Sequence, residues 1–343
     1  MQQLFIMATS DYSTSALFSL SENVLYNYST NSSFENNHQS YPLIVLQISL
    51  IILVYFTSTM GNMLMFFAFA FIPKKKTSEN GFTKRAAVDQ IISSLALIGM
   101  GRLLFQGPLQ AVCMIRGEWV FGNGFCQLQG FVGSLFRHLY IWYLAVFCLE
   151  RCTRYLKPHE YLSSFTDLTV RVILAGLLFV VIAQVTAPLY NWGEYKYLTG
   201  FYMCDQHPEA YFGCSYQIYL FISFALPALT MVTTVILLLK RGQCKLESRN
   251  SDSYLLEADK EIVTLVSLTV LSIFINLPRH LLDTFISCIN LRRVSDVVMY
   301  ICYWLENVTS SILPLLCILL HGKVRLRIKC FWKRFKENRK VTI

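Results

Sequence analysis

The sequence has few charged residues for its length. Asp, Glu, Lys and Arg make up 15% of 343 residues, whereas 54% are hydrophobic and the mean hydropathy is +0.45. Water-soluble domains of this length carry more charge, because most of their surface faces water. The composition therefore excludes an ordinary soluble enzyme and favours a polytopic membrane protein.

Sequence motifs of covalent chemistry are also missing. The chain has no paired CxxC motifs, no HExxH, no P-loop and no GxSxG. No two of the six histidines lie at helical spacing, and Cys317 with His321 is an isolated pair. We therefore expect no enzyme activity, no metal site and no cofactor. A transporter is the less favoured alternative, because no internal repeat is visible.

Positive charge is absent from one end of the chain. Residues 1–41 contain no Lys or Arg, whereas basic residues follow the first, third and fifth apolar stretches and crowd the C-terminal tail. By the positive-inside rule, the N-terminus is extracellular and the C-terminus cytoplasmic. Attraction to anionic lipid accounts for the net charge of +9, so no nucleic-acid partner is expected.

Long apolar stretches dominate the rest of the sequence, and each is near or above the roughly 20 residues that a spanning helix needs. They cover residues 42–72, 87–112, 126–149, 168–190, 214–239, 261–285 and 295–320. The pattern predicts an all-α membrane protein with a seven-transmembrane helix bundle. The expected organisation is an extracellular tail (1–41), the transmembrane domain (42–320) and a cytoplasmic eighth helix with its tail (321–343).

The third stretch carries a distinctive residue at each end. Cys126 and Arg151 would lie roughly 37 Å apart along a helix, which exceeds the roughly 30 Å of a hydrocarbon core. Cys126 then lies on the oxidising outer side, where it can pair with Cys204 of the loop 190–213. Cys214 is the competing partner, although it is expected to belong to the fifth span.

Several motifs in their joint order resemble the rhodopsin-like (class A) family of G-protein-coupled receptors. They are Gly61-Asn62, Leu95-Ala96, Trp119 to Cys126, Glu150-Arg151-Cys152 with Pro158, and prolines at 108, 188, 227, 278 and 314. Cys330, in a basic and aromatic stretch, resembles the palmitoylated cysteine of a short amphipathic eighth helix.

This resemblance implies a plasma-membrane receptor that binds an extracellular ligand and activates a heterotrimeric G protein. Glu150 and Arg151 would then form the coupling switch on the cytoplasmic side. The chain departs from the family at four landmarks, where it has Gly99, Cys152, Asn276 and Cys317. The departures at Gly99 and Cys317 also resemble bitter-taste and vomeronasal type 1 receptors, so a chemosensory receptor for small molecules is the alternative.

A second resemblance is to the opsins, on the spacing of Trp192, Tyr195 and Cys204. The position of the retinal lysine in opsins is Asn307 here, seven residues before Pro314. Without that amine no Schiff base forms, so the resemblance does not imply a retinal pigment.

Charged residues inside the spans are the candidates for a ligand site, because a charge at that depth needs a partner or a function. We expect Arg137 to pair with Glu306, with Arg102 as a rival for the same carboxylate. The pair can be a ligand trigger or purely structural. Other pocket candidates are Asn276, Asn307, Arg279 and His280. Arg279 and His280 with Arg137 suggest an acidic ligand or a peptide, unless Asp283 neutralises Arg279.

The N-terminal tail carries two glycosylation patterns, at Asn27 and Asn31. Their place on the expected extracellular side favours modification.

Overall fold

The computed structural model describes residues 41–70, 86–199, 201–207, 212–246, 252–289, 296–320 and 328–330. The chain divides into two compact units, Met1–Gln47 and Ile48–Ile343. Only the beginning of one helix is described in the first unit. Asn27 and Asn31, the predicted glycosylation sites, lie outside the described residues.

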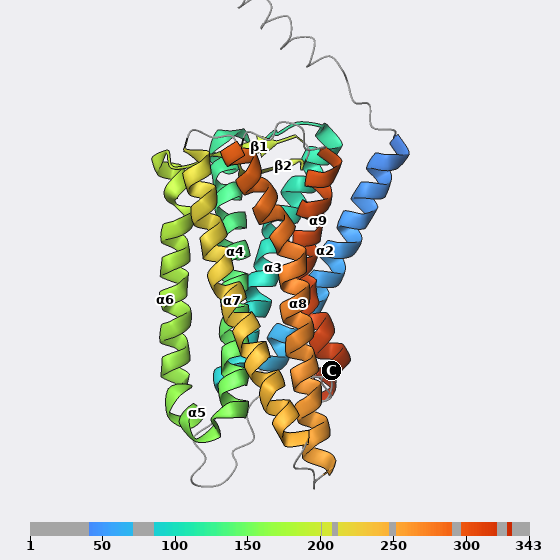
Figure 1. The fold of residues 1–343 in the computed structure, drawn as a ribbon. Helices are drawn as coiled ribbons and strands as arrows, with labels where there is room; N and C mark the ends of the chain where they lie inside the picture. Colours follow the sequence, from blue (N-terminus) through green and yellow to red (C-terminus); the bar gives the residue numbers. More distant parts are fainter. Residues whose placement is uncertain are drawn as a thin grey trace, which may run out of the picture. The chain divides into compact units, whose positions relative to one another are not determined.

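Long helices make up most of the described residues (Figure 1). They are α2 (Tyr41–Ala70), α3 (Ala86–Arg116), α4 (Gly122–Leu156), α6 (Asp167–Val185), α7 (Gly213–Leu246), α8 (Asp252–Ile289) and α9 (Asp296–Leu320). Six contain a segment long and apolar enough to cross a membrane, and α9 continues the bundle beside α8. A spanning chain must be helical because lipid offers no partner for backbone N–H and C=O groups. The predicted seven-helix bundle is confirmed.

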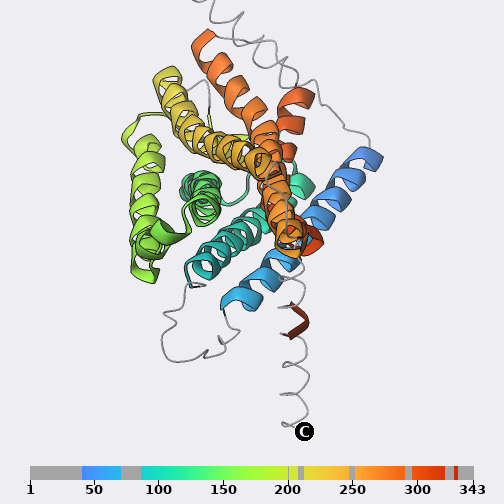
Figure 2. The same cartoon turned by 60° about the horizontal axis from the view of Figure 1, so that its bottom comes forward.

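Helix α4 lies in the middle of the other helices (Figure 2) and packs against α3, α6 and α7. It begins at Gly122, whose positive φ of 78° suits glycine. It ends before Lys157 because the following Pro158 disfavours helical geometry in the residue before it. Pro158 instead begins α5 (Pro158–Ser164). Residues at every level of α4 therefore face other parts of the protein.

The predicted spans differ from the helices at several ends. Helices α4, α7 and α8 extend beyond their apolar stretches, because backbone hydrogen bonding continues into polar turns outside the lipid. Helix α6 instead ends early, and Pro188 lies in the 3-10 turn η1 (Ala187–Tyr190). Pro188 therefore lies where the α-helix gives way to a 3-10 turn near the end of the candidate span Asp167–Tyr190. Proline is tolerated in the first turn of a helix, because the N–H group that it lacks would have no partner there.

A β-hairpin formed by β1 (Tyr195–Leu198) and β2 (Met203–Gln206) closes one end of the bundle (Figure 1). We call this end the outer end and the opposite end the inner end, after the orientation expected from the sequence. The strands are antiparallel, with Tyr195 opposite Gln206 and Leu198 opposite Met203. A lone two-stranded hairpin is marginal in water. Here all four residues of β2 are buried, and both strands contact α4, so packing on the helix bundle stabilises the hairpin.

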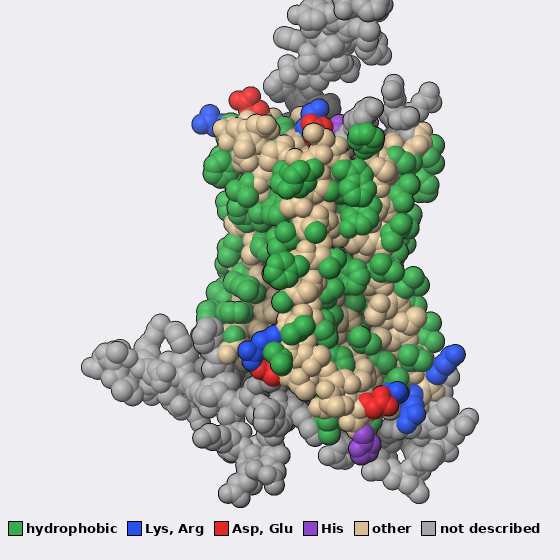
Figure 3. Space-filling model, turned by 90° about the vertical axis from the view of Figure 1, so that its left-hand side faces the viewer, with side chains coloured by type: hydrophobic (Ala, Val, Ile, Leu, Met, Phe, Trp, Pro, Cys, Tyr) green, Lys and Arg blue, Asp and Glu red, His purple; other side chains and the backbone are tan. Residues whose placement is uncertain are grey.

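Hydrophobic side chains cover the face that Figure 3 shows, and charged side chains lie at its two ends. Leu168, Val172 and Phe179 of α6 are all more than 60% exposed. An exposed apolar band on helices of this length is the surface expected toward lipid. The protein is therefore a multi-pass membrane protein.

The predicted eighth helix falls largely outside the described part of the chain. Residues 328–330 are helical, and Cys330 is exposed and has a free thiol.

Candidate functional site

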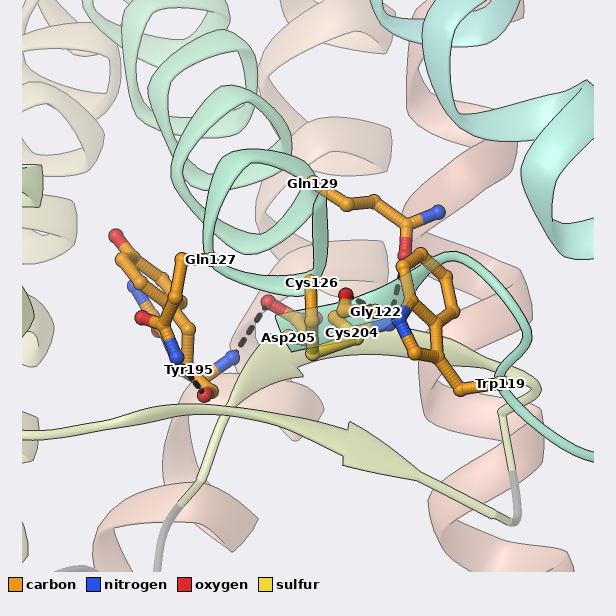
Figure 4. The surroundings of a disulfide bond; sticks show 9 residues. Trp119, Gly122, Cys126, Gln127, Gln129, Tyr195, Cys204 and Asp205 are labelled. Carbon is orange, nitrogen blue, oxygen red and sulfur yellow. Dashed lines mark hydrogen bonds between the residues drawn. A yellow bond between two sulfur atoms is a disulfide. The ribbon is translucent and has the colours of Figure 1, made fainter. Parts of the chain in front are cut away.

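The outer end of α4 is joined to the hairpin by a disulfide between Cys126 and Cys204, as the sequence predicted. Figure 4 shows two glutamines of α4 on either side of it. Gln127 Nε2 donates to the Tyr195 carbonyl at 2.8 Å, and Gln129 Oε1 accepts from the Cys204 N–H at 2.8 Å. The first turns of α4 thus bind both strands and fix the position of β2.

Tyr195 packs directly on the backbone of α4 at Gly130. Its hydroxyl donates to the Val185 carbonyl at the end of α6 at 2.7 Å. A Cβ at residue 130 would lie 2.7 Å from Cγ and 2.9 Å from Cβ of Tyr195, closer than real side chains approach. Glycine at this position therefore allows the hairpin to lie against the helix.

Gly130→Ala should lower the thermal midpoint of the purified protein by several degrees, because overpacking costs about 1–3 kcal/mol. Gly124→Ala is the matched control, since nothing lies within 4 Å of a Cβ there in the same helix. We expect no loss of stability in the control. Equal midpoints for the two variants would show that the hairpin does not need this close approach.

Arg137, midway along α4, binds two carboxylates from different elements. Its Nη2 lies 2.5 Å from Oδ1 of Asp205 on β2, and its Nε lies 3.2 Å from Oε1 of Glu306 on α9. All three side chains are at most 6% exposed. The expected ion pair between Arg137 and Glu306 is present, and Asp205 is a further partner that the sequence reasoning missed.

Arg102 of α3 shares Glu306 with Arg137, as the rivalry predicted from the sequence implied. Its Nη2 lies 3.1 Å from Glu306 Oε1 and donates to Asn307 Oδ1 at 3.1 Å. Its Nε donates to Gln106 Oε1 at 3.2 Å. Gly133 of α4 leaves room for the Gln106 amide, which a Cβ there would meet. Glycine at residue 133 thus allows the Gln106 side chain to pack against α4 beside the charged groups.

Arg279 of α8 is held between two carboxylates. Its Nε lies 2.7 Å from Oδ2 of Asp283, and its Nη2 lies 3.3 Å from Oδ2 of Asp205. The guanidinium also lies 5.1 Å from the ring centroid of Phe201 in the hairpin turn. The alternative in which Asp283 neutralises Arg279 is therefore the arrangement found.

Together these contacts form one alternating series of charges, which we call the ion-pair chain. It runs Asp283–Arg279–Asp205–Arg137–Glu306–Arg102 and joins α8, β2, α4, α9 and α3. Three guanidiniums face three carboxylates within the described residues, so the positive and negative charges of the ion-pair chain are equal in number. An unpaired buried charge is costly, whereas a fully paired set can fix the geometry of its helices.

Asp205 is the member outside the spanning helices. Burial alone would raise its pKa, but the charges of Arg137 and Arg279 outweigh burial and lower the pKa to about 2. The carboxylate is therefore ionised at neutral pH. Its pKa in the unfolded chain is about 3.9, so its contribution to the stability of the fold is lost only as the pH falls from about 3.9 toward 2.

The other pocket candidates lie outside the ion-pair chain. Asn276 Nδ2 donates to the Ser272 carbonyl at 2.6 Å and to Thr309 Oγ1 at 3.2 Å, which joins α8 to α9. The ring of His280 stacks on Phe224 with centroids 4.5 Å apart.

His138 Nδ1 lies 2.9 Å from the Ser134 carbonyl of its own helix, and the His138 ring meets that of His280 edge-on.

At the inner end of α4, Glu150 is completely buried and binds two side chains. Arg151 Nε lies 2.5 Å from Glu150 Oε2, and the Tyr161 hydroxyl of α5 donates to Glu150 Oε1 at 2.6 Å. Burial and the neighbouring Glu150 carboxylate raise the pKa of Tyr161, so it stays a neutral donor. The Glu150–Arg151 pair, predicted as the switch, is thus formed in this structure. The hydrogen bond from Tyr161 to Glu150 is a further contact that the sequence did not reveal.

Gly99, one of the four unusual landmarks, lies against α2. Beside Gly99, where the family carries an aspartate, the amide of Asn62 fills the space, 3.0 Å from where a Cβ would lie. Asn62 Nδ2 donates to the Ser58 and Ser310 carbonyls at 2.9 Å each, linking α2 to α9. The side chain of Cys317 lies outside the described residues.

A second disulfide, Cys214–Cys288, joins the outer ends of α7 and α8. The sequence reasoning missed it. Cys214 begins one predicted span and Cys288 lies just beyond the end of another, which is the signal that could have found the pair.

The site does not fit a covalently bound retinal. A Schiff base with retinal would need a lysine amine at the position of Asn307, as in opsins. Here Asn307 accepts from Arg102 at 3.1 Å, and its Nδ2 donates to the Tyr303 carbonyl at 3.2 Å. An amide engaged in this way offers no amine for a Schiff base.

Comparison with known proteins agrees with this geometry. Residues 61–316 match the family described as 7 transmembrane receptor (rhodopsin family). The Gq-coupled rhodopsin of Mizuhopecten yessoensis is 29% identical over 136 residues, which cover 40% of this chain and 26% of that protein. The blue-sensitive opsin of Carassius auratus is 26% identical over 201 residues, 56% of each chain. The chain therefore spans between a quarter and just over half of these relatives.

The crystal structure of squid rhodopsin has the same fold. It superposes with a TM-score of 0.71 at 15% identity and covers 84% of this chain and 85% of its own. Members of the matched family are receptors, which confirms that the chain is not an enzyme. The chain belongs to the rhodopsin family of seven-transmembrane receptors.

Proposed function

We propose that the protein is a plasma-membrane receptor that activates a heterotrimeric G protein when an extracellular ligand acts on its helix bundle. The observation that carries this proposal is the series of contacts along α4. The disulfide fixes its outer end, Arg137 in its middle binds Asp205 and Glu306, and Arg151 at its inner end is closed on Glu150.

The distribution of disulfides supports an extracellular hairpin. Both disulfides lie at the hairpin end of the bundle, and cysteine pairs persist in oxidising compartments. The opposite end carries Arg151, Lys157 and Arg171. This arrangement agrees with the positive-inside rule and with a cytoplasmic C-terminus.

The two ends of α4 suggest how a signal would cross the membrane. The ion-pair chain holds α3, α4, α8 and α9 in one arrangement through buried charges. A ligand that replaces one partner would favour a second arrangement, and it can shift the balance only by the difference in its affinity for the two. At the inner end, opening of the Glu150–Arg151 contact would expose the arginine to a G protein.

Arg151→Ala should reduce nucleotide exchange on a purified G protein by about tenfold or more, the scale of a typical coupling free energy. The receptor would be reconstituted in vesicles and assayed with a panel of heterotrimeric G proteins, with surface expression measured alongside.

Arg171→Ala is the matched control, because Arg171 is an exposed arginine paired with Asp167 at the inner end of α6. Its exchange rate should equal that of the wild type. The proposed function fails if no G protein responds to the wild type, or if Arg151→Ala retains the full rate.

A further inference from the structure

Asp205 differs from the other five members of the ion-pair chain in how it is held. Arg102, Arg137, Arg279, Asp283 and Glu306 are on helices of the bundle, whereas Asp205 enters from strand β2 of the hairpin. Loop and hairpin segments rearrange more readily than packed helices. Displacing Asp205 therefore requires a shift of one strand, which the neighbouring disulfide restrains, whereas the other members belong to helices.

Arg279 has more donor capacity than its two partners use. Its side chain is 2% exposed, and its Nη1 has no hydrogen-bond partner among the described residues. Asp205 contacts only Nη2, at 3.3 Å, whereas a carboxylate can bind the arginine fork through two parallel hydrogen bonds. Buried donors are almost always satisfied, so this spare donor beside an ion pair can take another acceptor.

The charges define which ligand would fit. With Asp205 in place, three arginines face three carboxylates. Without Asp205, Asp283 still neutralises Arg279, but Arg102 and Arg137 share Glu306 alone. One negative charge is then missing, next to both Arg137 and Arg279. A monoanion with two planar oxygens would restore the balance.

We propose that Arg137 and Arg279 form a carboxylate-binding site, which Asp205 of the hairpin occupies as an intramolecular ligand. A ligand with a free carboxylate competes for this site, and the hairpin sets the resting state of the receptor. The ligand class deepens the proposed function, but the site itself does not depend on coupling to a G protein.

The neighbouring disulfide determines how strongly Asp205 competes. Cys204 is bonded to Cys126 of α4, so Asp205 is tethered one residue from a fixed point. Tethering gives a group a high effective concentration. Small free acids should therefore bind weakly or not at all to the wild type, and clearly once Asp205 is truncated.

Chemical rescue tests the site directly. Asp205→Gly removes the atoms that acetate can replace, and it should lower the thermal midpoint of the purified receptor by about 4–7 °C. Acetate should recover at least half of this loss, with a half-maximal effect on the order of 1–10 mM for so small a ligand. Acetamide and sodium chloride at equal concentrations should recover none of it.

Two controls keep the result decisive. Acetate should leave the midpoint of the wild type unchanged, and it should not stabilise Asp167→Gly, which removes an exposed aspartate paired with Arg171. Asp205→Ala with formate is the second variant, in case the glycine prevents folding. The proposal is overturned if acetate stabilises all proteins equally, if acetamide works as well, or if neither Asp205 variant folds with its acid present.

A signalling measurement separates this inference from the proposed function. Basal nucleotide exchange should rise in Asp205→Gly, and acetate should lower it again. Thermal rescue without any exchange activity would support the carboxylate site and contradict G-protein coupling. Exchange activity without thermal rescue would contradict the site and leave coupling intact.

Discussion

Replacing Glu306 with glutamine should lower the thermal midpoint of the purified receptor by about 4–7 °C, because breaking a buried ion pair costs about 3–5 kcal/mol. Glu306 is 1% exposed and lies between Arg102 and Arg137. Its loss leaves Arg102 with the neutral acceptors Asn307 and Gln106. Two buried guanidiniums would then share too little negative charge.

Glu160→Gln is the matched control for this change. Glu160 pairs with Lys157, and both side chains are 61% exposed, so water screens the interaction. We expect its midpoint to stay within a degree or two of the wild type, as surface substitutions usually do. If Glu306→Gln were as stable as Glu160→Gln, the ion-pair chain would have no role in holding the bundle together.

The second large effect is expected from the disulfide between α4 and the hairpin. Replacing Cys126 and Cys204 together with serine releases a loop of 78 residues, for which chain entropy alone predicts a loss of about 4.5 kcal/mol. It also frees β2, so Asp205 is no longer held beside Arg137. Both the thermal midpoint and the restraint on basal exchange should fall.

The other disulfide provides the comparison. Cys214–Cys288 closes a loop of 74 residues, so its removal should cost a similar amount of stability. It leaves the hairpin attached, and basal nucleotide exchange should not rise. The account is contradicted if both double variants raise exchange to the same extent, because the effect would then follow from general loosening.

The helices could be predicted from the sequence because lipid imposes one requirement on every span, an apolar segment of sufficient length with all backbone groups bonded. Their ends were harder to predict. Helices α7 and α8 continue through polar turns that hydropathy does not mark, and α6 ends before Pro188.

The core of the candidate site could also be predicted, because a charge inside a span must find a partner. This requirement predicted contacts among Arg137, Arg102 and Glu306, and the structure brings the three together. Asp205 could not be found in this way. It belongs to a hairpin outside the spans, where no periodicity tells which side chain points into the bundle. Tyr161 was missed for the same reason at the inner end.

The central claim is that buried charges along α4 hold the receptor in its resting state, and a double-mutant cycle on basal nucleotide exchange tests it most directly. The cycle compares the wild type, Arg137→Gln, Glu306→Gln and the double variant in vesicles with one G protein. Each single change should raise basal exchange. The rate of the double variant should be close to that of either single variant, because the two single changes remove the same contact. Unchanged exchange in both single variants, or effects that multiply in the double variant, would contradict the claim.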